Sequence, residues 1–245
     1  MSITVFRHSG SGSIGNLEAA LIERGLPFKY RTAYEGDLSE FDASADDLLI
    51  FLGGNCGVYQ GDLFPFIGEE VRIIKERLEK DLPVLGICFG GQLIARALGS
   101  KVFRGDKGME CGWSSLQLTP EGEQSIMAHL GEAKTSMTHF HRDTFELPEG
   151  ASLLASTKLY RNQAFSYGSK ILALQCHPEV NYDILTNWEV NGMSNMAANG
   201  DLDLLQVRKD TAQYMDSLIK QADIFMHAWL DQIGMDRADI NAKSS

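Results

Sequence analysis

A cysteine flanked by glycines is the most reactive feature of the sequence. Cys88 lies in the run Gly86-Ile87-Cys88-Phe89-Gly90, after an apolar stretch and before a segment of helix formers. Glycines two positions to either side of a nucleophile permit the tight strand-to-helix turn called a nucleophile elbow. The start of the following helix favours thiolate over thiol, and the Phe89 N–H can face an oxyanion. The pattern predicts a nucleophile, although free cysteines also occur as small buried hydrophobes.

A base and a group to orient it follow a second apolar run. His177-Pro178-Glu179 comes directly after residues 171–176. Because proline keeps the residue before it extended, His177 and Glu179 should lie near one face of the chain. Glu179 could then accept a hydrogen bond from one imidazole nitrogen while the other faces Cys88. Alone, such a tripeptide is usually an ordinary strand end; together with the elbow it predicts a catalytic triad.

The elements that must hold these residues alternate in type through the first hundred positions. Apolar runs typical of strands occupy 3–7, 28–32, 48–52 and 83–87, and amphipathic runs typical of helices occupy 15–24, 69–80 and 91–98. Such alternation predicts an α/β fold. We expect a flavodoxin-like, doubly wound, mostly parallel sheet with helices on both faces.

The rest of the chain changes character. Strand-like runs follow one another over 100–120 and 151–175, which predicts an antiparallel extension and a last core strand at 171–176. Residues 201–234 are rich in helix formers, with apolar residues at helical spacing that favour packing on the core over a partner-binding stripe. We expect one domain over 1–245, with a C-terminal helical extension from about residue 182 to 245.

Charge and composition restrict the partners. The net charge of −11, with no basic run, argues against a nucleic-acid partner. The apolar stretches are too short to span a bilayer, and the N-terminus lacks the pattern of a signal peptide, so we expect no membrane partner. Cys56, Cys88, Cys111 and Cys176 show neither zinc-site nor disulfide spacing. We therefore expect a cytoplasmic protein.

Several motifs in a fixed order resemble those of the triad-type (class I) glutamine amidotransferases. The likeness is greatest to stand-alone proteins similar to the amidotransferase half of GMP synthase, and it covers roughly residues 45–180. The segments that carry it are 52–59, 83–93, 97–99, 110–113, 141–145, 163–165 and 175–179.

The resemblance implies a reaction for the predicted triad. Cys88 would attack the side-chain amide of glutamine, giving a γ-glutamyl thioester and ammonia, while His177 transfers the proton and Glu179 orients His177. Gly53 and Gly54 would supply backbone N–H groups to the oxyanion together with Phe89. Glycine suits that role because the backbone must approach the substrate closely.

The resemblance also implies substrate contacts. Gln92 would contact the substrate amide, although it could also be a polar residue that closes the site. The segment from His141 to Phe145, with Asp143 and Thr144, would hold the α-ammonium and carboxylate groups.

Three positions depart from the family pattern. Asn55 replaces a frequent proline, Cys111 replaces an aliphatic residue, and Gly91 replaces a larger residue. We expect Gly91 to widen the pocket. None of the three belongs to the triad.

The family comparison also bears on partners and substrates. A full GMP synthase needs a nucleotide-binding synthetase portion that this sequence does not contain, so ammonia would go to a separate synthetase subunit. The substrate is a small molecule, glutamine or another γ-glutamyl compound. The alternative is a γ-glutamyl peptidase or hydrolase that uses the same triad on glutathione-like compounds. No cofactor is expected.

Two other patterns must be weighed. Residues 10–15, read with Glu35, match the dinucleotide-binding fingerprint, but the resemblance places a glycine-containing loop there beside the active site. His139 and His141, with Cys176 and His177, could ligate a metal, yet no carboxylate-rich or CxxC pattern supports them. We expect no metal.

Overall fold

The computed structural model describes residues 1–235, so the end of the predicted C-terminal extension, 236–245, lies outside the described residues. The strands are β1 (Ile3–Arg7), β2 (Phe28–Thr32), β3 (Leu48–Phe51), β4 (Val84–Ile87), β5 (Val102–Arg104), β6 (Glu110–Ser114), β7 (Gln117–Leu118), β8 (Met137–His141), β9 (Asp143–Phe145), β10 (Ser152–Ser156), β11 (Ala164–Tyr167) and β12 (Ile171–Leu174). The α-helices are α1 (Glu18–Glu23), α2 (Phe66–Glu79), α3 (Phe89–Ala97), α4 (Pro120–Glu123), α5 (Tyr182–Trp188), α6 (Ser194–Ala198) and α7 (Leu204–Gln232).

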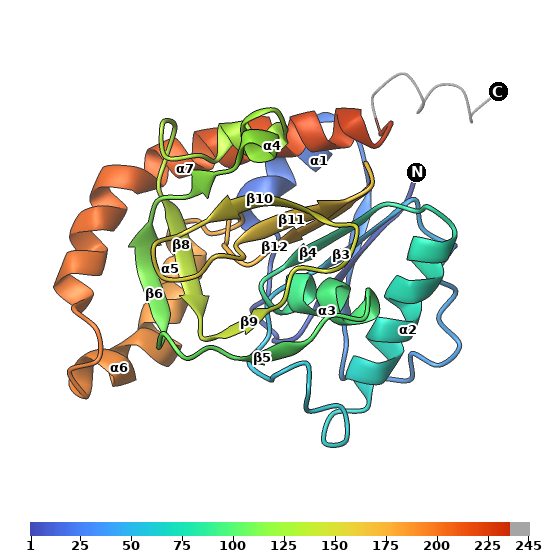
Figure 1. The fold of residues 1–245 in the computed structure, drawn as a ribbon, viewed down its shortest axis with the longest axis horizontal. Coiled ribbons are helices and arrows are strands. Elements are labelled where there is room, and N and C mark those ends of the chain that lie inside the picture. The colour runs from blue at the N-terminus through green and yellow to red at the C-terminus, as the bar shows by residue number, and fades with distance from the viewer. Residues whose placement is uncertain (236–245) are drawn as a thin grey trace.

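An eight-stranded sheet forms the centre of the fold (Figure 1). Its order is β2-β1-β3-β4-β12-β11-β10-β7. The pairs from β2 to β12 are parallel, and those from β12 to β7 are antiparallel. The predicted α/β fold, with a mostly parallel sheet and an antiparallel extension, is confirmed.

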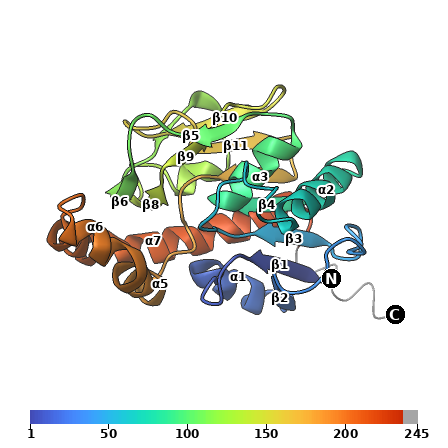
Figure 2. The same ribbon diagram turned by 90° about the horizontal axis from the view of Figure 1, so that it is seen from below.

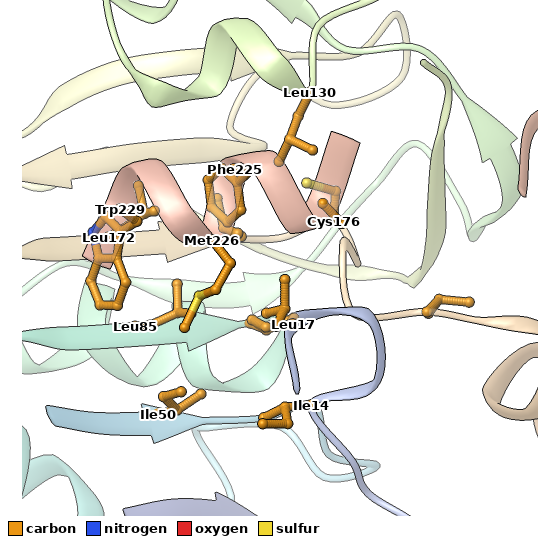
Figure 3. Packing of buried hydrophobic residues seen from close by; sticks show 14 of the residues in the cluster. Ile14, Leu17, Ile50, Leu85, Leu130, Leu172, Cys176, Phe225, Met226 and Trp229 are labelled. Carbon is orange, nitrogen blue, oxygen red and sulfur yellow. The ribbon is translucent and has the colours of Figure 1, made fainter. Parts of the chain in front are cut away.

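Alternation along the parallel strands builds two hydrophobic layers, one on each face of the sheet. Val5, Ile50 and Leu85 point into the layer covered by α1 and α7, where Phe225, Met226 and Trp229 of α7 reach the sheet (Figure 3). Their neighbours Phe6, Leu49 and Val84 point into the layer covered by α2 and α3. Helices therefore cover both faces (Figure 2), as predicted.

The first two predicted helices differ from those observed. Residues 15–17 form a 3-10 turn, and α1 begins only at Glu18. Helix α2 starts at Phe66 instead of residue 69, and its buried face includes Glu70 and Arg77, whereas Val71 and Leu78 are only partly buried. The hydrophobic pattern does not predict this face, because Glu70 and Arg77 are charged and are buried against polar partners.

Arg77 shows how one such charge is accommodated. Its guanidinium donates to the backbone oxygens of Ala43, Asp46, Asp47 and Pro83. Burial lowers the pKa of Arg77 to about 10 although nearby aspartates raise it. The buried cation thus ties α2 to the loops at the start of β3 and β4.

Two short antiparallel ribbons, β5 with β9 and β6 with β8, lie outside the main sheet. They carry residues of the predicted substrate segment, because β8 ends at His141 and β9 begins at Asp143. Helix α7 lies alongside α1 (Figures 1 and 2) and packs through buried apolar residues such as Met215, as the core interpretation of residues 201–234 predicts. Among residues 1–235, none of the helices is both long enough and apolar enough to cross a bilayer.

Candidate active site

Cys88 occupies the turn between β4 and α3 in a conformation that L-residues seldom adopt. Its backbone has φ 54° and ψ −106°, a strain of the order of 1–3 kcal/mol that is often found at functional sites. A Cβ atom at Gly86 would collide with the Gly90 carbonyl, and one at Gly90 with the Phe51 carbonyl. Both flanking glycines are therefore required, and the predicted elbow geometry is present.

The groups around the thiol are fixed by the sheet. The Cys88 N–H donates to the Leu174 oxygen at 2.6 Å, and the Gly90 N–H donates to the Leu52 oxygen at 3.2 Å. The Phe89 N–H, in the first turn of α3, has no intrahelical partner. A Cβ atom on Gly53 would lie 3.5 Å from Cε1 of His177 and 3.7 Å from Cβ of Cys88. Gly53 thus borders both side chains.

His177 and Glu179 meet directly after β12. Nδ1 of His177 lies 2.7 Å from Oε1 of Glu179, and both side chains are buried. Thr138 fixes the backbone of His177 through two hydrogen bonds, and the imidazole packs on Trp188 in a T-shaped arrangement with ring centroids 4.7 Å apart. Such a hydrogen bond to Nδ1 leaves Nε2 for chemistry.

The electrostatics of His177 favour its protonated form. Burial lowers the pKa of the imidazole, but the Glu179 carboxylate and the charge on Cys88 outweigh burial and raise it to about 10. Nε2 makes no hydrogen bond of ordinary geometry to any other part of residues 1–235. A buried imidazolium beside a cysteine is the arrangement that favours a thiolate.

Two hollows open beside Cys88. One, the loop-side hollow, has a volume of about 530 Å³ and is bordered by Ser9, Ser13, His177, Asn187, Trp188 and Asn191. The other, the ribbon-side hollow, has a volume of about 850 Å³ and is bordered by Tyr59, Gln92, Arg104, Arg142 and Asp143. Because Cys88 and Gly54 belong to both, the thiol lies where the two hollows meet.

The structure places the predicted substrate residues unequally. His141 and Asp143 border the ribbon-side hollow. Gln92 borders it too, although its amide nitrogen already donates to the Asp143 backbone oxygen and to Gln175. Thr144 is buried within β9, where it pairs with Phe103 of β5, and it is absent from the borders of both hollows in the described chain.

The expectation that Gly91 widens the pocket is wrong. A Cβ atom there would lie 2.7 Å from the carbonyl oxygen of Leu174, so this glycine allows α3 to approach β12 closely. Its small size serves helix–sheet packing.

Glu110, His139 and His141 form the one potential metal-ligating group found within residues 1–235, with their ligand atoms within 4.8 Å of one another. Cys176 and His177 are not part of it. Hydrogen bonds already join its members: Oε2 of Glu110 lies 2.9 Å from Nε2 of His141 and accepts from the Gln163 amide. Because the amide N–H of Gln163 already points at the Glu110 oxygen that a metal ion would need, we describe the group as a buried polar network between β6 and β8.

The glycine-containing loop at 10–15 lies beside the active site. Ser11, Gly12 and Ser13 border the loop-side hollow. Gly15 has φ 45°, and a Cβ atom there would collide with the Glu179 carbonyl, while the Asn16 N–H donates to that oxygen at 2.9 Å. The glycine is thus explained by close packing on the His177–Glu179 segment, and α1 is only six residues long.

Several residues at the site were not anticipated. Asn187, Trp188 and Asn191 come from α5 and from a π-helical turn over Glu189–Met193, an irregularity frequent at functional sites. Arg104 borders the other hollow and was not anticipated either, whereas Arg142 lies within the predicted segment 141–145. No local spacing signals Asn187, Trp188, Asn191 or Arg104, because only the tertiary fold brings them to the two hollows.

Comparisons with known proteins show which family the chain resembles. The model of the family "Glutamine amidotransferase class-I" matches residues 7–185. Gamma-glutamyl peptidase 4 of Arabidopsis thaliana is 40% identical over 116 residues, 46% of this chain and 46% of that protein. One subunit of the glutamine-hydrolyzing GMP synthase of Methanosarcina barkeri is 35% identical over 116 residues, 45% of this chain and 60% of the relative.

A solved structure resembles the whole fold. The crystal structure of a glutamine amidotransferase from Thermotoga maritima superimposes with a TM-score of 0.82 and 26% identity, covering 95% of this chain and 98% of that one. The sequence matches, by contrast, span only about half the length of the two curated relatives.

Proposed function

Because the chain belongs to the class-I glutamine amidotransferase family, we propose that it hydrolyses the side-chain amide of glutamine through a γ-glutamyl thioester on Cys88. The observation that carries the proposal is the strained elbow at Cys88 beside the buried His177–Glu179 pair, with all three residues bordering one hollow. A nucleophile, a base and its orienting group are the parts that acyl transfer requires.

The proposed reaction has two halves. The Cys88 thiolate attacks the amide carbon, the carbonyl electrons move to oxygen, and the tetrahedral intermediate collapses as the C–N bond breaks. His177 donates its proton to the departing nitrogen, so ammonia leaves and a thioester remains. Neutral His177 then removes a proton from water as the water oxygen attacks the thioester carbon. The second tetrahedral intermediate collapses as the C–S bond breaks, so glutamate leaves and the Cys88 thiolate stands again beside protonated His177.

Backbone N–H groups would stabilise the oxyanion. The Phe89 N–H lies in the first turn of α3, and the Gly53–Gly54 turn borders Cys88. Such donors contribute about 10²–10³-fold to kcat in related chemistry.

The ribbon-side hollow suits the amino-acid end of the substrate. Arg104, Lys107 and Arg142 could bind a carboxylate, and Asp143 and Asp201 could bind an ammonium group. We place the γ-glutamyl moiety there, with its amide carbon at Cys88. The leaving group would then face the loop-side hollow.

Ammonia release from L-glutamine tests the proposal. Wild-type protein should release ammonia and glutamate in equal amounts, and Cys88→Ala should release neither. Wild-type protein that hydrolyses no γ-glutamyl amide, and is not labelled at Cys88 by a glutamine-like electrophile, would contradict it.

One observation favours a second function, that of a γ-glutamyl peptidase. The loop-side hollow, about 530 Å³, is far larger than an ammonia molecule needs, and serines and asparagines provide most of its polar border. Such a hollow could bind the amino-acid or peptide leaving group of a glutathione-like substrate. The similarity to an Arabidopsis gamma-glutamyl peptidase supports the same alternative.

The two functions differ in substrate preference. Values of kcat/KM for glutamine and for glutathione separate them, with Asn187→Ala as the variant of the loop-side hollow. If glutamine is the substrate, this variant should leave glutamine hydrolysis within about threefold, whereas a peptidase should lose most of its activity towards glutathione.

The remaining parts of the proposal concern context. We propose that ammonia passes to a separate synthetase polypeptide, as the similarity to the GMP synthase of Methanosarcina barkeri suggests. Residues 1–235 would form one domain with a C-terminal helical extension from about residue 182. Four free cysteines fit a reducing cytoplasm.

A further inference from the structure

His8 forms a buried pair with Glu70 directly behind the Gly53–Gly54 turn. Nδ1 of His8 lies 3.1 Å from the Gly53 backbone oxygen. Nε2 lies 3.0 Å from both carboxylate oxygens of Glu70. The two side chains are 1% and 0% exposed, so water cannot substitute for either partner.

The partners of His8 determine where its protons lie. Both ring nitrogens face oxygen atoms, and a backbone carbonyl can only accept. Nδ1 must therefore carry a hydrogen and donate to Gly53. The contact between Nε2 and Glu70 needs a second proton, which makes the pair neutral as a whole; a neutral imidazole beside a carboxylate would leave a net buried charge.

The hydrogen bond to Gly53 also sets the direction of the next N–H. Within residues 1–235 every peptide bond is trans, and in a planar trans peptide the C=O and the following N–H point in opposite directions. Since the Gly53 oxygen points to His8, the Gly54 N–H points away from it. The turn borders the nucleophile, because a Cβ atom on Gly53 would lie 3.5 Å from Cε1 of His177 and 3.7 Å from Cβ of Cys88.

Packing leaves this arrangement little freedom. The His8 ring meets Phe89 edge-on with centroids 4.6 Å apart, and a Cβ atom on Gly54 would lie 3.0 Å from Cβ of His8. His8 follows β1 and Gly53 lies just beyond β3, and these two strands are paired in parallel. Glu70 reaches the pair from the buried face of α2.

We infer that His8 and Glu70 are positioning residues for the oxyanion turn: a proton-sharing pair donates through Nδ1 of His8 to the Gly53 oxygen and fixes the Gly54 N–H for the developing oxyanion at Cys88. The inference rests on the proposed γ-glutamyl transfer to Cys88. Neither residue contacts the substrate.

Two neutral double variants isolate the donor. His8→Asn/Glu70→Gln keeps an N–H that can reach the Gly53 oxygen, whereas His8→Leu/Glu70→Met removes it without leaving an unpaired buried charge. Three quantities are measured for each: kcat for glutamine or the preferred γ-glutamyl substrate, the thermal unfolding midpoint, and the rate of Cys88 alkylation by iodoacetamide. Alkylation forms no oxyanion, so it reports the thiolate alone.

The expected pattern is selective. In the apolar variant, His8→Leu/Glu70→Met, kcat should fall about 10²–10³-fold, whereas KM should change far less and Cys88 should be alkylated at nearly the wild-type rate. In the amide variant, His8→Asn/Glu70→Gln, most of the lost kcat should return. Wild-type kcat in the folded apolar variant would overturn the inference. An alkylation rate that falls as far as kcat would overturn it too, because the pair would then support the whole site.

A spectroscopic measurement is independent of turnover. NMR spectra of ¹⁵N-labelled wild-type protein should show a hydrogen on Nδ1 of His8. An Nδ1 without a hydrogen would overturn the inference, whether or not the apolar variant folds. If wild-type protein hydrolyses no γ-glutamyl compound, the proposed function fails, and the protonation of Nδ1 still decides the His8 contact.

Discussion

Nδ1 of His177 lies 2.7 Å from Oε1 of Glu179, two residues further along the same chain segment. Pro178 separates them, and its carbonyl oxygen accepts a hydrogen bond from the Asn16 amide, so the segment is fixed from its far side. The orienting group of the proposed base is therefore supplied locally, and it needs no long-range assembly of its own.

Replacing Glu179 should affect catalysis more than folding. Glu179→Gln removes the carboxylate that raises the pKa of His177, and we expect kcat for ammonia release to fall by about 10²–10⁴-fold. Steady-state kinetics measure the loss. Glu149→Gln, at an exposed position, is the matched control, and equal activity in the two variants would exclude Glu179 from the mechanism.

The elbow predicts a contrast between two glycines. Gly90→Ala places a Cβ atom into the Phe51 carbonyl, and we expect destabilisation of about 1–3 kcal/mol or more. Gly68→Ala lies within α2 with open space around it, and it should stabilise by about 0.5–1 kcal/mol. Urea unfolding measures both. A Gly90→Ala protein as stable as wild type would mean that the turn leaves room for a Cβ atom beside the Phe51 carbonyl.

His139 should make the protein sensitive to mild acid. Burial lowers the pKa of His139 to about 4 from its ordinary 6.5, although the Glu110 charge raises it. Below pH 6.5 the unfolded chain binds a proton that the folded protein excludes, so this contribution to stability is present above pH 6.5 and is lost as the pH falls towards 4.

The effect is measurable by urea unfolding at pH 7.5 and pH 5. From pH 7.5 to pH 5 the free energy of unfolding of the wild-type protein should fall by about 2 kcal/mol more than that of His139→Gln. The variant keeps a donor for the Ser114 oxygen that His139 contacts. Equal losses in the two proteins would show that His139 titrates normally.

Removing the charge of Asp143 in the ribbon-side hollow should weaken substrate binding. Asp143→Asn removes a charge proposed to hold the substrate ammonium, and KM for L-glutamine should rise about tenfold or more with a much smaller change in kcat. Asp106→Asn, an exposed position outside the two hollows, should leave KM unchanged. An unchanged KM in both variants would place the ammonium elsewhere.

The sequence was most informative where chemistry depends on local order. Gly86, Cys88 and Gly90 shape one turn, and His177 and Glu179 share one segment, so their spacing, taken together with the order of the strands and helices, predicts their geometry. The alternation of strands and helices likewise predicted the parallel sheet. The exact ends of α1 and α2 were not predicted, since tertiary packing decides which turns become helical.

Residues that act through distant partners could not be found in this way. Glu70 and His8 are 62 positions apart, and a charged residue on a helix gives no local sign that its partner is buried. Asn191 borders the loop-side hollow from a π-helical turn that follows α5, which no periodic pattern indicates. Thr144 adjoins Asp143 in sequence, but along a strand neighbouring side chains point to opposite faces.

Covalent capture of the intermediate tests the central claim most directly. Wild-type protein mixed with L-glutamine, quenched in acid within its first turnovers and examined by peptide mass spectrometry should carry a γ-glutamyl group on the peptide that contains Cys88. The adduct should be absent from Cys88→Ser and should accumulate in a variant whose second half-reaction is slowed. Ammonia release by wild-type protein with no adduct on Cys88, or release that persists in Cys88→Ser, would contradict the account.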